Sequence, residues 1–222
     1  TTNLEPGLRS RSFSIHSMAY DPRRVSLHDP HGGLADTRER VLRGIADPTR
    51  RFTQMPLEAL RAAGLLARFR YQPHPNLLPG FQAAIAGLAK VRRADLRRSL
   101  LALLDLTKPG RAIKILHATG IEKSLFPGAC SDSGPIMNQL PRDRWLRLAI
   151  WLRGTAVQKH LQQLAVSRPV ASRVQKILRH HPIEEVENPR HLWRLSSDER
   201  AQLFRLRRAE LDQPAAEPGS RE

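Results

Sequence analysis

The stretch that decides the fold is Asp47 to Tyr71, which reads DPTRRFTQMPLEALRAAGLLARFRY. Apolar residues recur in it at steps of three and four, the spacing of one helix face: Leu57, Leu60, Ala63 or Gly64, and Ala67. Pro56 stands in the first turn, where a helix tolerates proline. A mixed strand-and-turn pattern precedes this stretch, and only helical patterns follow it. Residues 47–72 are therefore predicted to form a neck helix between two architectures.

The charge of the chain points to a phosphate-bearing partner. The 222 residues carry 37 basic and 21 acidic side chains, a net charge of +16, and only six of the basic residues are Lys. Arg binds phosphate oxygens through two parallel hydrogen bonds, and a protein this basic attracts nucleic acid by counterion release. We therefore expect RNA as a partner. A membrane is not expected, since no apolar run approaches the length of a membrane span.

Before the neck, the pattern is mixed. Residues 1–10 are predicted to be a flexible leader. Apolar and polar residues alternate from Arg11 to Tyr20, which favours a strand, and a second short strand is expected at Arg24–Leu27. Gly and Asp-Pro pairs in residues 28–36 predict a tight loop. Cys130 is the only cysteine, so the sequence offers neither a disulfide framework nor a thiolate metal cluster.

After the neck, residues 73–211 read as a succession of amphipathic helices, and residues 212–222 as a disordered tail. Two apolar faces stand out by their spacing: Leu96, Leu100, Leu103 and Leu104, and Val170, Val174, Ile177 and Leu178. The predicted fold class is mainly α, with a small α+β part at residues 11–46. The alternative is a wholly helical bundle whose N-terminal part packs irregularly.

The neck also resembles a motif of bacterial-type (class II) tRNA nucleotidyltransferases and poly(A) polymerases, Arg-Phe-x-Glu-Asp-Pro-x-Arg-x-Leu-Arg-Ala. The matching residues are Arg51, Phe52, Pro56, Leu57, Leu60, Arg61 and Ala62. The family's Glu-Asp pair is Gln54 and Met55 here, and its Arg is Glu58. The resemblance implies that the Asp and Arg of the motif read the base of CTP or ATP. A Met side chain cannot make that hydrogen bond, and Glu58 reverses the charge.

Two further segments resemble this family, and the resemblance extends over about residues 11–181. Residues 11–22 are similar to Arg-Arg-Asp-Phe-Thr-Ile-Asn-Ala-Leu-Ala-Tyr-Asp-Pro, in which Arg11 would be what is left of a triphosphate clamp. Residues 29–43 are similar to Asp-Pro-x-x-Gly-x-x-Asp-Leu followed by Leu-Arg, and Asp29, Gly33, Asp36 and Arg43 match. These four either belong to a degenerate nucleotide site or hold the fold together, as capping Asp residues also do.

The resemblance implies a truncated nucleotidyltransferase head at residues 11–46, followed by a helical neck, body and tail. Nucleotidyl transfer uses two metal ions held by clustered carboxylates. The family supplies them from an Asp-x-Asp strand, a pattern absent from this sequence. Only ten residues precede Arg11, so we expect no catalytic residues and no cofactor, with Mg²⁺ needed only if another segment or chain donates the missing half. A rival metal site, His28 and Asp29 with His31, lacks the further ligands that such a site needs.

The body helices carry the predicted RNA contacts. Arg92, Arg93, Arg97 and Arg98 form two pairs one helical turn apart, and four more arginines surround Trp145 and Trp151: Arg142, Arg144, Arg147 and Arg153. Such faces could follow an RNA backbone, although any one of these residues could equally be part of a solvated surface. In the family, the body and tail hold tRNA.

The predicted function is that of a catalytically inactive, nucleotidyltransferase-like RNA-binding protein. It would contact rRNA or tRNA together with other proteins of a large ribonucleoprotein, such as an organellar ribosome. The alternative is a fragment or subunit of an active CCA-adding enzyme or poly(A) polymerase. The first residue is not Met, which suggests a processed targeting segment, and hence a mitochondrial or other organellar matrix, or else a fragment of a longer cytoplasmic protein.

Overall fold

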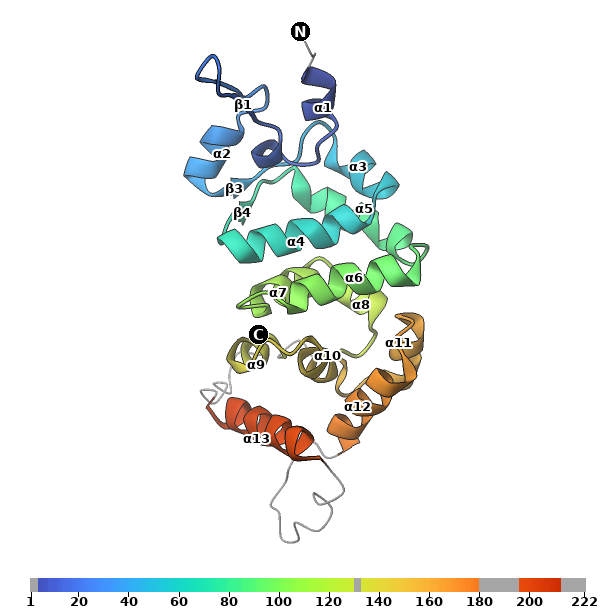
Figure 1. The fold of residues 1–222 in the computed structure, drawn as a ribbon. Coiled ribbons are helices and arrows are strands. Elements are labelled where there is room, and N and C mark those ends of the chain that lie inside the picture. Colours follow the sequence, from blue (N-terminus) through green and yellow to red (C-terminus); the bar gives the residue numbers. More distant parts are fainter. Residues whose placement is uncertain (1–3, 130–132, 180–195, 213–222) are drawn as a thin grey trace, which may run out of the picture.

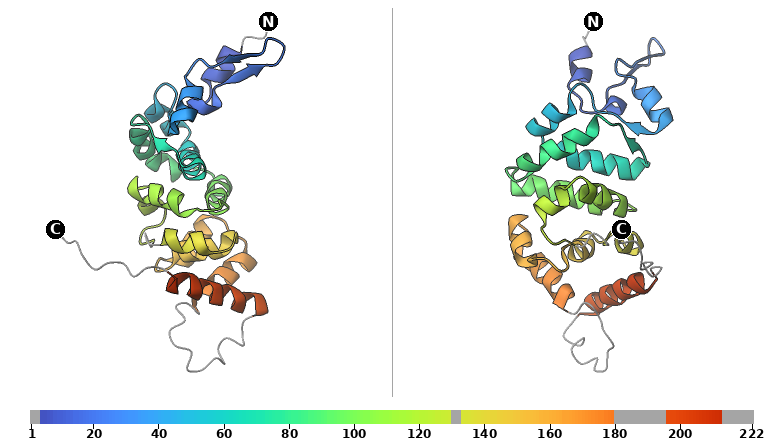
Figure 2. Two further views of the ribbon diagram at one scale, coloured as in Figure 1. Left: turned by 90° about the vertical axis from the view of Figure 1, so that its left-hand side faces the viewer. Right: turned by 180° about the vertical axis from the view of Figure 1, so that it is seen from behind.

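The computed structural model describes residues 4–129, 133–179 and 196–212. Helices lie in successive layers below a small head (Figure 1). The chain is elongated and bent, with the head leaning away from the axis of the helical layers (Figure 2). The elements are α1 Glu5–Arg9, η1 Ser14–His16, β1 Ala19–Asp21, β2 Ser26–His28, α2 Gly33–Glu39, β3 Val41–Leu42, α3 Pro48–Gln54, α4 Leu57–Phe69, β4 Gln72–Pro73, α5 Leu77–Leu88, α6 Arg93–Leu104, α7 Gly110–Ala118, α8 Ile121–Leu125, α9 Ser133–Gln139, α10 Arg144–Leu152, α11 Val157–Gln163, α12 Arg168–Arg179 and α13 Ser197–Leu211.

The head differs from its prediction in three places. Residues 5–9 form helix α1 with Leu8 buried, where a flexible leader was expected. The long strand expected from Arg11 to Tyr20 is instead the 3₁₀ turn η1 followed by β1. The second strand, β2, begins at Ser26 rather than at Arg24, because the carboxylate of Asp21 accepts hydrogen bonds from two backbone N–H groups of the turn between the strands.

The 3₁₀ turn is explained by hydrogen bonds from two serine hydroxyls to residues elsewhere in the chain. The hydroxyl of Ser14 donates to Asp36 at 2.5 Å, and the hydroxyl of Ser17 donates to the carbonyl of Leu8 at 2.8 Å. Both serines are buried, so these bonds satisfy groups that would otherwise lose their hydration. Side-chain alternation alone could not reveal such partners, which lie far along the chain.

The predicted single neck helix is two helices, α3 and α4. Asp47 caps α3 by accepting from the backbone N–H of Thr49, and Pro48 occupies the first helical turn. The break falls at Met55 and Pro56, since proline has no N–H with which to continue the hydrogen bonding of α3. After α4, residues 72–73 form β4, which pairs in parallel with β3 and ties the neck back to the head.

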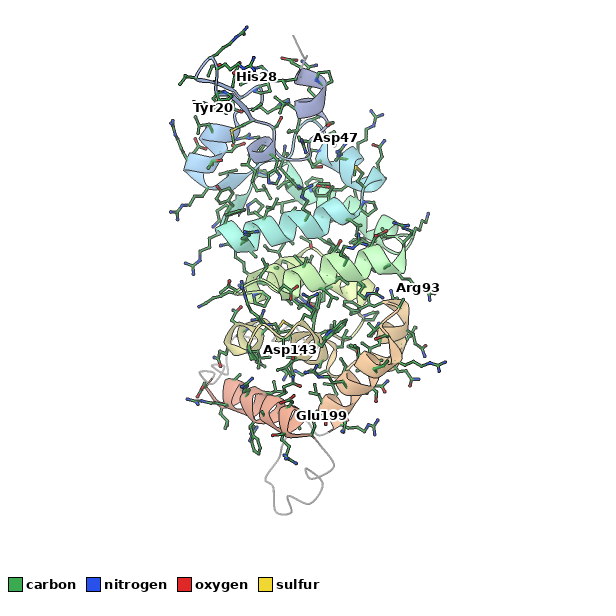
Figure 3. The ribbon with its side chains drawn as sticks, viewed as in Figure 1. Tyr20, His28, Asp47, Arg93, Asp143 and Glu199 are labelled. Atoms are coloured by element: carbon green, nitrogen blue, oxygen red, sulfur yellow. The ribbon has the colours of Figure 1, made fainter. Side chains whose placement is uncertain are left out.

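The body confirms the predicted apolar faces. All four leucines of the first set are buried on α6, and Val174 and Ile177 are buried on α12 while Val170 and Leu178 are partly buried. One continuous core runs from Phe13 in the head to Ala209 in α13. Asp143 joins the last layers, because it caps α10 and also accepts from Arg173 of α12 and Gln202 of α13 (Figure 3).

The structure confirms a mainly α fold with a small α+β head. The head contains the antiparallel pair β1–β2, so the wholly helical alternative is wrong. None of the helices in the described part of the chain has the length and apolar character of a membrane span. The predicted tail lies outside the described residues from position 213 onward.

Candidate nucleic-acid interface

Buried Asp36 and half-exposed Arg43 form an ion pair at the base of the head. The guanidinium of Arg43 contacts the Asp36 carboxylate at 3.0 to 3.1 Å, and its remaining Nη1 lies 2.8 Å from Nε2 of His74. Burial raises the pKa of Asp36, but the hydrogen bonds from Arg43 and Ser14 outweigh it, so the pKa lies below its ordinary value. Both carboxylate oxygens are thus engaged, and the pair joins α2, η1 and the segment that follows β4.

Asp29 and Gly33 shape the loop that leads into α2. The two carboxylate oxygens of Asp29 accept from the backbone N–H groups of Gly33 and Leu34 at 2.7 and 2.8 Å. A Cβ on Gly33 would lie 2.3 Å from the carbonyl oxygen of Ser14, so this position requires glycine. The contacts of these residues are those of a structural loop.

The rival metal site of His28, Asp29 and His31 is not assembled in the structure. Within the described ranges, no cluster of three His, Cys, Asp or Glu residues could hold a metal ion.

A second group of predicted residues meets at the junction of head and neck. The pKa of His16 lies below its ordinary value, mainly because the ring is partly buried. The positive charges of Arg61 and Arg11 lower this pKa further, and the negative charge of Glu58 raises it. Nη1 of Arg61 lies 3.4 Å from Oε1 of Glu58. The other oxygen of Glu58 is buried, with no hydrogen-bond partner among the described residues. His16 was not among the predicted site residues, and only its position inside a family-like motif could have indicated it.

The base-reading positions lie at the bend of the neck. Gln54 ends α3 and is exposed, and Met55 stands between the helices with 45% of its surface exposed. Glu58 and Arg61 occupy the first two turns of α4 and line a cleft of about 330 Å³ between α4 and α6, together with Ser99 and several leucines. The neck therefore presents a thioether and a carboxylate where the family motif has a carboxylate and a guanidinium.

The arginines of α6 differ in what they contact. Arg92 and Arg98 both pair with Asp95, at 2.6 and 3.3 Å, and remain largely exposed. Arg93 is exposed at the start of the helix (Figure 3). Arg97 instead donates to the carbonyls of Leu164 and Ala165 at the end of α11. Arg92, Arg93 and Arg98 thus remain on the surface, whereas Arg97 joins α6 to α11.

The predicted RNA-binding face of α10 is wrong for Arg147. Its side chain is 1% exposed and donates to the carbonyls of Leu104, Leu106 and Leu140 at 2.5, 2.7 and 2.9 Å. Nη1 and Nη2 donate to these carbonyls, which lie at the ends of other segments, while the buried Nε has no hydrogen-bond partner among the described residues. Burial, followed by the nearby charge of Arg142, lowers the pKa of Arg147.

The neighbours of Arg147 are arranged around a buried helix. Every residue from Leu146 to Leu152 is buried, including Trp151, whose indole N–H donates to Glu122. Arg153 pairs with Glu210 at 2.7 Å and is largely buried. Arg142 and Arg144 are exposed, and contact Thr107 at 2.7 Å and Asp105 at 2.8 Å. Of this group, therefore, only Arg142 and Arg144 lie on the surface.

Comparisons with known proteins agree with the motifs. No family model matches the sequence. The chain is 29% identical over 132 residues to the multifunctional CCA protein of Xanthomonas campestris pv. campestris, which is 57% of this chain and 32% of that relative. It is 31% identical over 126 residues to the CCA-adding enzyme of Bacillus licheniformis, or 57% of this chain and 31% of that one. The chain thus spans about a third of the length of the curated relatives it matches.

Solved structures show the same fold over nearly the whole chain. The CCA-adding enzyme of Bacillus stearothermophilus in complex with CTP is similar with a TM-score of 0.78 at 20% identity, over 96% of this chain and 57% of that one. The Thermotoga maritima CCA-adding enzyme complexed with tRNA gives a TM-score of 0.74 at 20% identity, over 92% and 57%. This chain therefore has the fold of the corresponding part of a CCA-adding enzyme and resembles the tRNA nucleotidyltransferase family over part of its length.

Proposed function

We propose that this chain is the neck, body and partial head of a CCA-adding-type nucleotidyltransferase, and that it holds tRNA. The observation that carries the proposal is the fold match over 96% of the chain to part of a CCA-adding enzyme. The net charge of +16 supports it, because cationic surfaces bind RNA phosphates. The exposed arginines Arg92, Arg93, Arg98, Arg142 and Arg144 would supply backbone contacts.

For nucleotide transfer, this chain would need metal-binding carboxylates from a segment or chain other than this sequence. The described residues hold no metal-ligand cluster, and the sequence has no Asp-x-Asp. Such a segment would supply the two-metal chemistry, in which one metal ion activates the attacking hydroxyl and the other stabilises the leaving group. Met55 and Glu58 cannot pair with a base as the family motif implies, so nucleotide choice would rest on other residues.

The first test is binding. Fluorescence anisotropy with a labelled tRNA and with a duplex DNA of equal phosphate number separates RNA recognition from charge alone. We expect tRNA to bind more tightly at every salt concentration, because DNA of equal charge shares only the sequence-independent attraction. Equal affinity for the two nucleic acids would contradict a tRNA-holding role.

The second test asks whether this chain can transfer nucleotides without a further segment or chain. Incubation of this chain with tRNA lacking its CCA end, labelled CTP and ATP, and Mg²⁺ is expected to give no incorporation. The mass of the native protein, compared with the 25.1 kDa of this chain, shows whether further sequence is attached. Incorporation by this chain alone would refute the need for a second segment. A native protein of 25.1 kDa with no co-purifying partner would refute the proposal that a further segment or chain completes the enzyme.

A structural role in an organellar ribosome stays a prediction, as does an organellar location. The comparisons concern CCA-adding enzymes and give neither idea support. Sedimentation of the native protein with ribosomal particles, retained at salt concentrations that remove loosely bound tRNA, would favour the ribosomal role over the one proposed above.

A further inference from the structure

A cleft of about 590 Å³ opens where the neck meets the body. Three separate segments form its walls: the end of α4, the end of α6 with the residues after it, and the turn before α10. Four of the side chains that line it are cationic and exposed: Arg68, Arg70, Lys108 and Arg142. The cleft thus gathers cations from segments that lie far apart along the chain.

The side chains of these four cations are available to bind an external anion. Within the described part of the chain, none of them has an Asp or Glu oxygen within ion-pair distance; Arg142 donates to the hydroxyl of Thr107 at 2.7 Å. Asp105 also lines the cleft, but it is paired with Arg144 at 2.8 Å. Like charges that line one cleft repel one another, and an anion bound between them would relieve that repulsion.

We propose that this cleft binds phosphate groups. The proposal rests on the RNA-holding function above and adds a site to it, one that none of the predicted α6 residues shares. Arg68, Arg70 and Arg142 offer planar guanidinium groups that match pairs of phosphate oxygens, and Lys108 adds a compact charge. The phosphates come either from an RNA backbone or from a free nucleoside triphosphate.

The walls of the cleft favour phosphate over a nucleobase. Its remaining lining residues are Ala67, Ala102, Leu106 and Thr107, so no aromatic side chain is available on which a base could stack. Base recognition on single strands relies on such stacking, whereas backbone contacts need only cations and hydrogen-bond donors. The chemistry of the site is therefore that of an anion site.

The experiment compares three proteins of the full chain. The first is the wild type, and the second is the cleft variant R68Q/R70Q/K108Q/R142Q. The third is a control that removes the same charge from exposed positions on α2, α3 and α13, R38Q/R50Q/R205Q/R208Q. All eight side chains belong to surface positions, so each variant should fold, which circular dichroism checks.

One arm measures the affinity for a labelled tRNA acceptor hairpin over a series of salt concentrations, and the other measures ATP binding by calorimetry. We expect the cleft variant to lose at least about tenfold in affinity in one arm, the weight of one charge-assisted hydrogen bond. In the RNA arm, the slope of log affinity against log salt should fall by about 0.7 to 0.9 for each phosphate that the variant no longer neutralises. The arm in which affinity falls identifies the source of the phosphate.

The outcomes separate this proposal from the function on which it rests. If the wild type binds RNA and the cleft variant weakens no more than the control in both arms, the phosphate site is refuted and the RNA-holding function stands. If the wild type binds neither RNA nor ATP, both fail together.

Discussion

Replacing Arg147 with Met tests whether this residue holds the body together or contacts RNA. The structure places its guanidinium against three carbonyls, from Leu104, Leu106 and Leu140. Met has nearly the same helix propensity as Arg and fills a similar volume, so the change removes mainly the hydrogen bonds. The three carbonyl oxygens would then remain in the interior without this donor.

The expected destabilisation follows from those three groups. A buried polar group left unsatisfied costs about 1–3 kcal/mol, so three of them cost at least about 3 kcal/mol. Part of this destabilisation is offset, because folding of the variant no longer transfers a charged guanidinium from water into the interior. A net destabilisation of about 3 kcal/mol corresponds to a fall in melting temperature of roughly 6–12 °C for a protein of this size.

Arg144→Met is the matched control on the same helix. Arg144 is 48% exposed and pairs with Asp105, and exposed ion pairs contribute only about 0–1 kcal/mol. Urea unfolding followed by circular dichroism should therefore separate the two variants clearly. Tight RNA binding by folded R147M would agree with a structural role. If R147M unfolds no more easily than R144M but binds RNA more weakly, the reasoning is refuted.

Gly33→Ala should destabilise the head by about 1–3 kcal/mol in thermal unfolding, because its Cβ would lie 2.3 Å from the carbonyl oxygen of Ser14. Gly7→Ala, in α1 with nothing within 4 Å, should stabilise slightly, and similar destabilisation in both variants would contradict the close approach. Asp36 has a folded pKa below its ordinary value of 3.8, so its stabilisation is complete above that pH and is lost as the pH falls towards the folded pKa. The unfolding free energy of Asp36→Asn should therefore decline less than that of the wild type between about pH 5 and pH 2, and parallel curves would show that Asp36 does not contribute.

Helical spacing predicted the body well, since each helix buries a face that the sequence displays within two or three turns. The four leucines of α6 illustrate this, because all are buried where the spacing places them. The head was harder to predict. The hydroxyl of Ser14 binds Asp36, which lies 22 residues later, and that hydrogen bond favours a 3₁₀ turn over a strand.

The site residues divide in the same way. Sequence patterns placed Asp36 and Arg43 in one motif, as residues of a degenerate nucleotide site or of the fold, but could not show that they bind each other. Arg147 looks like its neighbours Arg142 and Arg144 in the sequence, yet it points into the core. Arg142 of the neck–body cleft was among the predicted RNA contacts, but Arg68, Arg70 and Lys108 were missed because the four cations come from three segments with no common motif.

The layered arrangement has a consequence for how the chain unfolds. Each layer packs mainly on its neighbours, as α4 does on α6 and α7, α6 on α10, and α10 on α12. In structures with mainly nearest-neighbour packing, groups of elements can open independently. Hydrogen exchange should therefore be graded along the molecule, with the amides of α12 and α13 exchanging through openings that leave α4 closed. Arg147 hydrogen-bonds both the end of α6 and the residue that follows α9. It therefore sets how cooperatively the layers up to α6 unfold together with the layers from α9 onward.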